Sequence, residues 1–420
     1  FNPSLKLDVN LSYNKVYSPN YPRYGYGPKN HMYTILLWMG NDVNGKELSE
    51  HLYIPGQDGF RQANYNYAWY NNPYFAAEEL NQQHNRDVLH GQSTLNWQIS
   101  SKFFLQGRAS ARQNMTFEDM QSPKSYMNYG DSRNGDYKVW NNKRLDFDAD
   151  VLATYQENFG ENFGININAG SSTYQRKFNN FYSATDGLIV PQLYALGNTQ
   201  GPSTSTSFLS EKVIRSVYGS VSFDILRSTY LNFSARNDWS STLPIDNRNY
   251  FYPSAGLSYI FTDALNISNK ILSYGKVRAN FAQTRRDVPP YQLATTYNVT
   301  SPSYLTPSGA TIYSSSLSDA LKNAGLKPEG LKEIEFGADL NFLDGRIKMD
   351  LTYYVKTSTD LFVTKRIPVS SGFSTQAINA GSIENKGYEA GVDFTWIKTN
   401  SGFTWNTYFA FNRVVSQVLK

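Results

Sequence analysis

The sequence of 420 residues contains no cysteine. This absence excludes a disulfide framework and any metal site with thiolate ligands. Histidine is scarce as well: the chain has 4 histidines, and none has the spacing of a metal site. No phosphate-binding loop or nucleophile motif is present either. We therefore expect no metal, no cofactor and no catalytic residue, and a protein that is not an enzyme.

The sequence also lacks a long hydrophobic run and a strong charge imbalance. The longest apolar stretch, Met32 to Met39, is far shorter than the ~20 residues that a transmembrane helix needs. The 39 Lys and Arg residues are nearly balanced by 35 Asp and Glu residues, so we predict no nucleic-acid partner. The mean hydropathy of -0.51 suits a soluble protein, but alternating transmembrane strands with polar loops average to similar values.

The chain does contain many segments in which apolar and polar residues alternate. In KRLDFDADVLATYQ, from Lys143 to Gln156, the alternating residues are Leu145, Asp146, Phe147, Asp148, Ala149, Asp150 and Val151. A helix would scatter this pattern around its axis, whereas a strand places the carboxylates on one face and the apolar groups on the other. About thirteen such segments occur along the chain, and the aromatic content of 15% also favours strands.

The links between these segments alternate in length. The long polar links are Ser18–Leu89, Gln121–Asn142, Tyr182–Ser210, Arg285–Gly330 and Thr364–Asn385. Those between them are mostly short, such as LRST near Leu226, although the link near Pro244 is short where a long one is expected. A soluble sandwich has no reason to keep this alternation, whereas outer-membrane barrels combine short periplasmic turns with long extracellular loops. We therefore predict an all-β fold, a transmembrane antiparallel β-barrel.

In such a barrel, one face of each strand contacts lipid and the other faces a wet lumen. The alternation assigns six charged residues to the lumen: Asp146, Asp148, Asp150, Lys348, Asp350 and Lys356. These residues could line a path for a solute. The alternative, which the pattern favours, is that they hydrate the barrel wall and pair with Lys or Arg on adjacent strands.

Longer phrases of the sequence point to a family. They are FSARNDWSSTLPIDNRNYFYPSAGLSYIFTD (Phe233–Asp263), KVRANFAQT (Lys276–Thr284), LKPEGLKEIEFGADLNFLDGRIKMDLTYYVKTSTDLFV (Leu326–Val363) and NAGSIENKGYEAGVDF (Asn379–Phe394). As an ordered set, these phrases resemble the SusC/RagA-type TonB-dependent transporters of the Bacteroidetes outer membrane. The resemblance covers most of the chain, although each phrase alone is mostly typical of barrels in general.

The resemblance implies a barrel of about twenty-two strands that is closed by an N-terminal plug. It also implies import of an oligosaccharide or oligopeptide, energised through the TonB–ExbB–ExbD complex, with a SusD-like surface lipoprotein as a lid. The chain shows no plug, no TonB-interacting segment, no signal peptide and too few strands. We therefore expect residues 1–420 to be the central part of one barrel domain in the bacterial outer membrane, in contact with its lipid.

The longest predicted loop contains YNYAWYNNPYF, in which aromatic and amide side chains are interleaved. Aromatic faces stack on sugars or on protein partners, and amides pair with hydroxyl or peptide groups. The predicted ligand- or lid-binding residues are Tyr65, Tyr67, Trp69 and Tyr70. Internal packing of a long loop explains the same residues equally well, and the sequence does not choose between the two.

Two functions of different classes remain open at the level of sequence. The first is an active importer with a lipoprotein lid. The second is a structural or protein-secretion-associated outer-membrane barrel that imports no nutrient. A plug and a TonB-interacting segment would distinguish them, because both belong to the importer.

Overall fold

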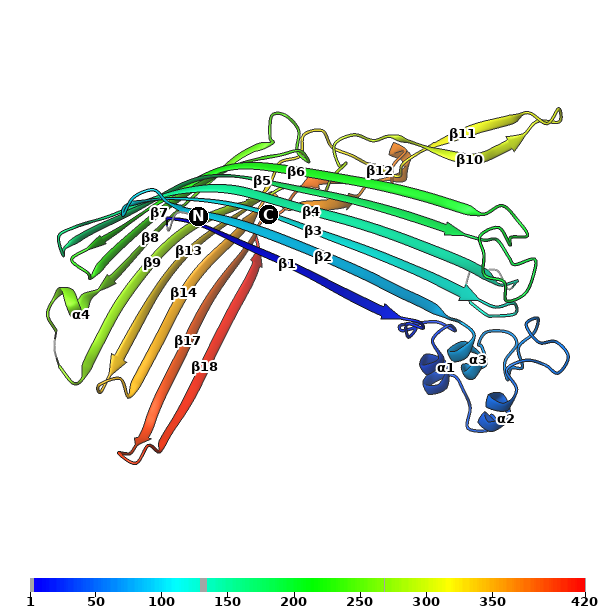
Figure 1. The fold of residues 1–420 in the computed structure, drawn as a ribbon, viewed down its shortest axis with the longest axis horizontal. Coiled ribbons are helices and arrows are strands. Elements are labelled where there is room, and N and C mark those ends of the chain that lie inside the picture. Colours follow the sequence, from blue (N-terminus) through cyan, green and yellow to red (C-terminus); the bar gives the residue numbers. More distant parts are fainter. Residues whose placement is uncertain (1–3, 129–133, 268, 420) are drawn as a thin grey trace.

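The computed structural model describes residues 4–128, 134–267 and 269–419, most of which belong to one antiparallel sheet (Figure 1). This sheet has 13 strands in the order β1-β2-β3-β4-β5-β6-β7-β8-β9-β13-β14-β17-β18. Their bounds are β1 (Leu5–Ser18), β2 (Gln82–Gln98), β3 (Phe103–Ser122), β4 (Asp136–Phe159), β5 (Phe163–Ala184), β6 (Thr204–Ile225), β7 (Thr229–Ser240), β8 (Asn249–Ile260), β9 (Leu272–Arg286), β13 (Glu329–Phe342), β14 (Ile347–Thr359), β17 (Ile383–Lys398) and β18 (Thr404–Val418). The all-β antiparallel prediction and the number of alternating segments are confirmed.

Smaller elements occupy the connections between these strands. The helices are α1 (His31–Leu37), α2 (Gly45–Glu50), α3 (Pro73–Glu78) and α4 (Phe261–Ala264), with one 3₁₀ turn, η1 (Val369–Ser371). β10 (Tyr297–Leu305) and β11 (Thr311–Leu317) form a hairpin, and a three-stranded sheet contains β12 (Ala320–Leu321), β16 (Thr375–Asn379) and β15 (Phe362–Arg366). Among the described residues, none of the helices combines the length and the apolar character required to cross a membrane.

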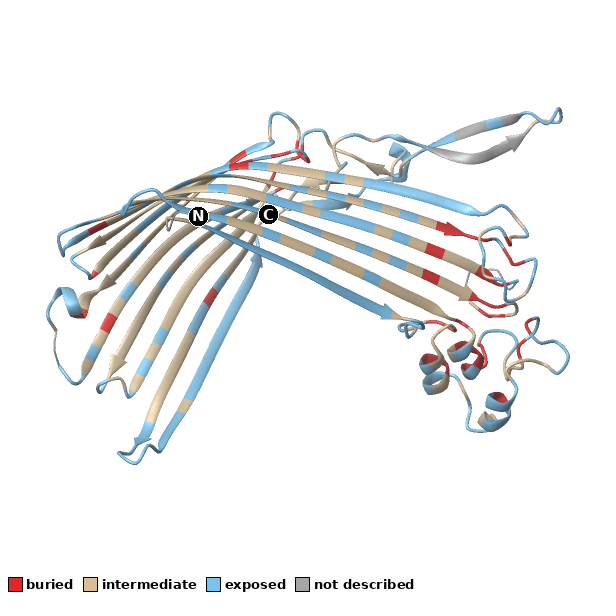
Figure 2. Cartoon of the chain, viewed as in Figure 1, coloured by how far each residue is buried: buried red, intermediate tan, exposed pale blue. Residues whose placement is uncertain are grey.

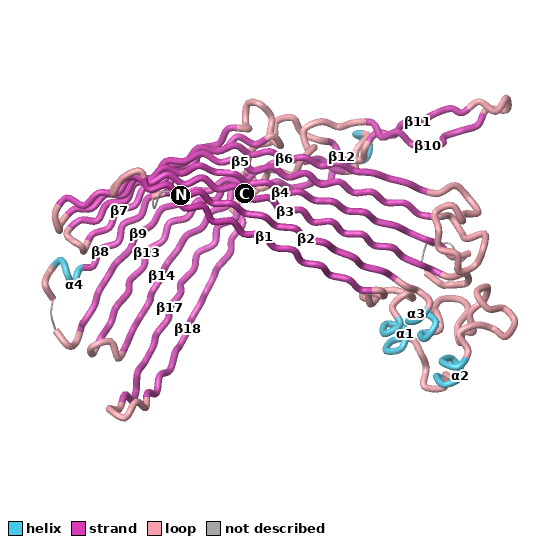
Figure 3. Tube along the Cα trace, in the orientation of Figure 1, coloured by secondary structure: helices cyan, strands magenta, loops and turns pink. Residues whose placement is uncertain are grey.

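The connections divide between the two ends of the sheet, as Figure 3 shows. One end, which we call the loop end, carries the connections 19–81, 123–135, 185–203, 241–248, 287–328 and 360–382. The other, the turn end, carries 99–102, 160–162, 226–228, 261–271, 343–346 and 399–403. At one turn, Leu226 and Arg227 have φ of 54° and 55°, as the central residues of a type I′ turn require. The predicted alternation of long and short links is thus confirmed, including the short link near Pro244.

The strands extend further into the predicted loops than the sequence indicated. β2 begins at Gln82 rather than near Gly91, and β4 begins at Asp136 rather than near Lys143. The predicted link 364–385 also contains β16 and the start of β17. In the extension of β2 polar residues occupy both faces, so the alternation that marks a strand is missing although the backbone pairing continues. In the extension of β4 a short alternation, Asp136–Val139, is interrupted by Trp140, Asn141 and Asn142. The predicted long links were therefore too long.

The sheet has one polar and one apolar face. A row of cross-strand neighbours on the polar face contains Arg112, Asp146, Arg176 and Lys212. A row on the apolar face contains Val221, Phe233, Ala255, Phe281, Ile334 and Val355. Along the strands most residues are half-buried or exposed, and buried residues gather mainly at the loop end (Figure 2). An exposed apolar face of this extent requires an apolar partner.

The first long connection folds onto the loop end beside β1 and β2, where α1, α2 and α3 lie together (Figure 1). Phe75, Ala76 and Leu80 form a small buried core with Tyr126 from the next connection. Buried amides tie the same two connections, because Asn71 donates to the carbonyl of Met127 at 2.9 Å and accepts from its amide at 2.6 Å. These contacts fix the position of the predicted aromatic loop residues.

Candidate functional site at the loop end of the polar face

The first predicted carboxylate of β4, Asp146, is held by two arginines on the polar face. Arg144 donates from Nε at 2.7 Å, and Arg176 on β5 donates from Nε at 2.8 Å. The Tyr174 hydroxyl donates to the same carboxylate at 3.1 Å. Asp146 is therefore a shared acceptor that draws the two guanidinium groups together.

The other two predicted carboxylates of β4 lie further toward the turn end. Asp150 accepts two parallel hydrogen bonds from Arg108 on β3, at 2.9 and 3.2 Å. Asp148 lies between Asp146 and Asp150, and no ion pair or hydrogen bond of its side chain is found among the described residues. The pairing with arginine on adjacent strands is as the sequence analysis favoured for Asp146 and Asp150.

The three predicted residues of β14 also lie on the polar face. Asp350 accepts from Arg278 of β9 at 3.0 Å, and Lys356 pairs with Glu333 of β13 at 3.2 Å. Within the described part of the chain, Lys348 has no ion pair. Most of the predicted polar-face charges thus belong to cross-strand ion pairs rather than to one cluster.

The four predicted loop aromatics divide into two packed and two exposed rings. Tyr70 stacks on Trp38, with ring centroids 5.3 Å apart, and burial raises the pKa of Tyr65 to about 12. Tyr67 and Trp69 remain 46% and 59% exposed. The packing alternative therefore describes Tyr65 and Tyr70, while the ligand- or lid-binding role stays a prediction for Tyr67 and Trp69, whose rings are exposed.

A feature that the sequence analysis missed is a bridge over the short β7–β8 hairpin. β6 extends beyond the end of β7, and the segment after β9 crosses this gap to reach it. Asp287 pairs with Lys212 of β6 at 2.6 Å and accepts from the Ser240 hydroxyl at 2.5 Å. The Tyr291 hydroxyl accepts from the backbone N–H of Glu211 at 3.1 Å. These bonds hold the segment Asp287–Tyr291 against the extended part of β6.

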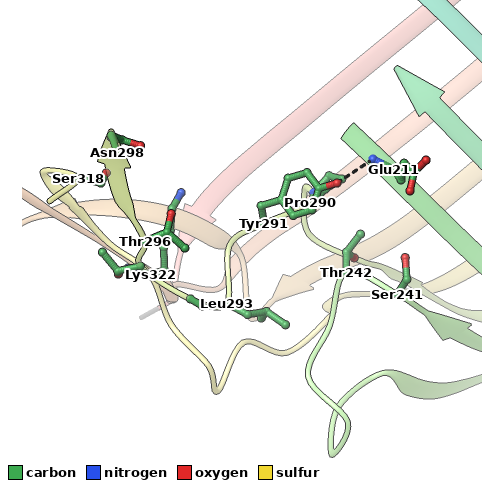
Figure 4. A pocket seen from close by; sticks show the side chains of 12 residues that line it. Glu211, Ser241, Thr242, Pro290, Tyr291, Leu293, Thr296, Asn298, Ser318 and Lys322 are labelled. Atoms are coloured by element: carbon green, nitrogen blue, oxygen red, sulfur yellow. Dashed lines mark hydrogen bonds between the residues drawn. The ribbon is translucent and has the colours of Figure 1, made fainter. Parts of the chain in front are cut away.

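A cavity lies on either side of this bridge. The first, of about 520 Å³, is shown in Figure 4 and is bordered by Tyr291, Leu293 and Lys322. Tyr291 adopts the left-handed region, with φ 60°, which a bulky residue rarely takes. The hydrogen bond to Glu211 and the edge-on contact with Phe208 hold this conformation. This cavity and the second one, of about 420 Å³, both fall within the size range of sites for small molecules or parts of larger ligands.

The second cavity, of about 420 Å³, opens on the polar side of the bridge and is strongly cationic. Its lining includes Arg144, Arg176, Lys212 and Arg286. Three of these residues come from the consecutive strands β4, β5 and β6, and the fourth comes from β9, which the β7–β8 hairpin separates from β6. Each could be assigned to a strand face from the alternation, but only the strand registers reveal that they meet.

Comparison with known proteins agrees with this architecture. Residues 3–417 match the family described as TonB dependent receptor-like, beta-barrel. TonB-dependent receptor P3 of Formosa agariphila is 30% identical over 274 residues, which cover 64% of this chain and 26% of that protein. TonB-dependent receptor SusC of Bacteroides thetaiotaomicron is 29% identical over 213 residues, covering 48% of this chain and 21% of SusC. In structure, a chain of the RagAB peptide transporter superposes with a TM-score of 0.79 at 18% identity, covering 99% of this chain and 45% of that one.

A large antiparallel sheet with one apolar and one charged face defines the wall of an outer-membrane barrel. The chain belongs to the TonB-dependent receptor β-barrel family. The resemblance to SusC/RagA-type proteins and the location in the outer membrane are thereby confirmed. Membership of a receptor family also supports the expectation that the protein is not an enzyme. The chain spans less than half the length of each of these relatives.

Proposed function

We propose that this chain is the central part of the barrel wall of an active importer that takes up oligosaccharides or oligopeptides. The main support for this proposal is that the sheet has two unlike faces. Its continuous apolar face suits contact with lipid, and its charged face suits a water-filled path. In this proposal the polar-face charges line the lumen: Asp146, Asp148, Asp150, Lys348, Asp350 and Lys356. Ion pairs of Asp146, Asp150, Asp350 and Lys356 with neighbouring residues balance most of these charges within the wall.

The proposed importer works with partners that lie outside this chain. The family resemblance supports energy input through the TonB–ExbB–ExbD complex and a SusD-like surface lipoprotein as a lid. The structural relative, RagAB, is a peptide transporter, and this supports an oligopeptide as one cargo class. The loop end would then be extracellular, because long loops lie on that side of outer-membrane barrels.

We also propose that residues 1–420 form part of one barrel domain, which further strands and a plug complete. β1 and β18 are exposed along most of their length at the two edges of the sheet. An unpaired strand edge is not tolerated in lipid, so both edges require partners. The alternative function, a structural or secretion-associated barrel, needs neither a lid contact nor a ligand site at the loop end.

The exposed loop aromatics provide the test of this proposal. Replacing Tyr67 and Trp69 together with alanine should leave barrel assembly intact, because neither ring belongs to the sheet. It should reduce uptake, or weaken the free energy of association with the lid by about 2 kcal/mol or more, which is the cost of losing an aromatic anchor at an interface. The measurement is growth on the nutrient of the wild-type strain, with co-purification of the lipoprotein, at equal surface abundance.

The matched control is Tyr24→Ala, because Tyr24 lies in the same connection and is 84% exposed. This variant should behave like wild type. If the double variant and Tyr24→Ala are indistinguishable from wild type in both readouts, Tyr67 and Trp69 have no part in the mechanism. A wild-type protein that supports uptake of no nutrient would instead favour the structural or secretion barrel.

A further inference from the structure

We infer that the cationic cavity beside the bridge is a subsite for an acidic group of the cargo, a carboxylate. This inference deepens the proposed function and rests on it, because the acidic group belongs to the transported molecule. It names a substrate class that the comparisons do not: acidic oligosaccharides or acidic oligopeptides rather than neutral ones.

The four cations converge because of the strand registers. Arg144, Arg176 and Lys212 lie on the polar face of β4, β5 and β6, and the last two are direct cross-strand neighbours. Arg286 is the last residue of β9, on the same face as Arg278. The bridge carries Arg286 toward β6, since the next residue, Asp287, pairs with Lys212 at 2.6 Å. Side chains from four strands therefore line one cavity.

The charge of the cavity is not balanced by its own carboxylates. Asp146 is shared by Arg144 and Arg176, and Asp287 is used by Lys212. The lining thus holds four cations and one carboxylate, Asp287, with Asp146 beside it; Asp148 and Glu329, the cross-strand neighbour of Arg286, lie on the same face but form no ion pair with the four cations among the described residues. The excess positive charge in a partly enclosed site attracts an anion, since clefts lined by one sign of charge focus the field.

Arg286 is the group best placed to bind the anion directly. Its side chain is exposed, and it has no hydrogen bond or ion pair with any residue in the described part of the chain. A guanidinium presents a fork of N–H donors that matches a carboxylate. Arg144 and Arg176 each keep further N–H groups beyond those that bind Asp146, so they can add bonds to the same ligand.

Two aromatic rings complete the cavity. Phe178 and Phe208 line it, and Phe208 is 53% exposed. Phe208 also contacts Tyr291 of the bridge edge-on, at 6.4 Å between ring centroids. A face of apolar rings beside a cationic cluster suits a sugar acid or an acidic peptide, whose apolar surface stacks while its charged group binds the arginines. A volume of about 420 Å³ has room for a residue or two of such a chain.

The test is binding to the natural full-length protein, measured by calorimetry at low salt with two pairs of probes. One pair is an oligogalacturonate and its methyl ester, and the other is an Asp/Glu-rich peptide and its Asn/Gln counterpart. At least one acidic probe should bind more tightly than its neutral counterpart. Arg286→Gln should weaken the binding of that probe about tenfold or more, the worth of a charge-assisted hydrogen bond, and leave the neutral counterpart unchanged.

The matched control is Arg86→Gln. Arg86 lies on the polar face of β2 at the loop end, is exposed, and also lacks a partner among the described residues, but it is outside the cavity. This variant should bind the acidic probe as wild type does. Arg286→Glu should weaken binding further than Arg286→Gln, because it adds repulsion.

Two outcomes would overturn the subsite. One is that neither acidic probe binds better than its neutral counterpart, and the other is that Arg286→Gln and Arg86→Gln have equal effects. The pair of probes that responds identifies the class of cargo. Uptake that depends on TonB but not on Arg286 would reject the subsite alone, whereas the absence of any TonB-dependent uptake would reject the proposed function itself.

Discussion

Replacing Val221 with arginine should destabilise the barrel by about 2–4 kcal/mol, the penalty for a cation on the lipid face near the midplane. Val221 lies on the apolar face of β6 between Ile167 and Phe233, its cross-strand neighbours. It stands a few residues from the turn end at Ile225, and a tilted strand needs roughly ten residues to cross a bilayer. Val221 therefore lies close to the middle of the apolar band. The measurement is the free energy of unfolding in lipid vesicles.

The adjacent substitution Ser222→Arg is the control. Ser222 faces the polar side and borders a cavity of about 270 Å³ that can admit a longer side chain. This variant should unfold within about 0.5 kcal/mol of wild type, as a substitution at a wet surface does. A greater loss of stability in Ser222→Arg than in Val221→Arg would reverse the assignment of the two faces.

Replacing Arg278 with methionine should have a comparable effect on stability. Arg278 contacts Asp339 at 2.8 Å, Asp350 at 3.0 Å and Glu335 at 3.4 Å, and its own side chain is only 18% exposed. Without it, Lys276 is the one cation among the described residues that remains paired with Asp339, at 2.9 Å. Removing a partner from a buried ion pair costs about 3–5 kcal/mol, and because the Asp350 side chain is exposed we expect about 2–4 kcal/mol.

The control for this prediction separates charge from packing. Adding Glu335→Gln and Asp350→Asn to Arg278→Met neutralises the two carboxylates that lose Arg278 as their ion-pair partner, while Asp339 keeps Lys276. This triple variant should recover most of the lost stability, measured by unfolding in lipid vesicles. Arg278→Lys should be intermediate, because it keeps the charge but not the planar fork. If the triple variant is no more stable than Arg278→Met alone, packing rather than electrostatics explains the loss.

The sequence predicts the wall of this protein better than its loop end. In the wall, one face of each strand is apolar, so alternation marks the strands and assigns residues such as Asp146 and Asp350 to the polar face. Beyond the membrane both faces are polar. The start of β2 at Gln82 therefore carries no alternation, and the alternation at the start of β4, Asp136–Val139, is short and interrupted, so both were predicted as loop.

The candidate sites are likewise only partly predictable from the sequence. Tyr65, Tyr67, Trp69 and Tyr70 are recognisable as an aromatic cluster, but only the packing of the loop shows which rings are buried. The cavity lined by Arg144, Arg176, Lys212 and Arg286 depends on strand register and on the bridge from Asp287. The strand register and the position of the bridge cannot be derived from one sequence, because register is a property of pairs of strands.

The central claim, that the two faces of this sheet meet lipid and water, is tested most directly by spin labels along β4. The chain has no cysteine, so single cysteines introduced one at a time give clean labelling sites. The sites are Ala149, Asp150, Val151, Leu152, Ala153 and Thr154. In lipid nanodiscs, the accessibility of the labels to oxygen should peak at the odd-numbered sites and that to a water-soluble nickel complex at the even-numbered sites. Profiles without a two-residue period, or with the two maxima exchanged, would contradict the account.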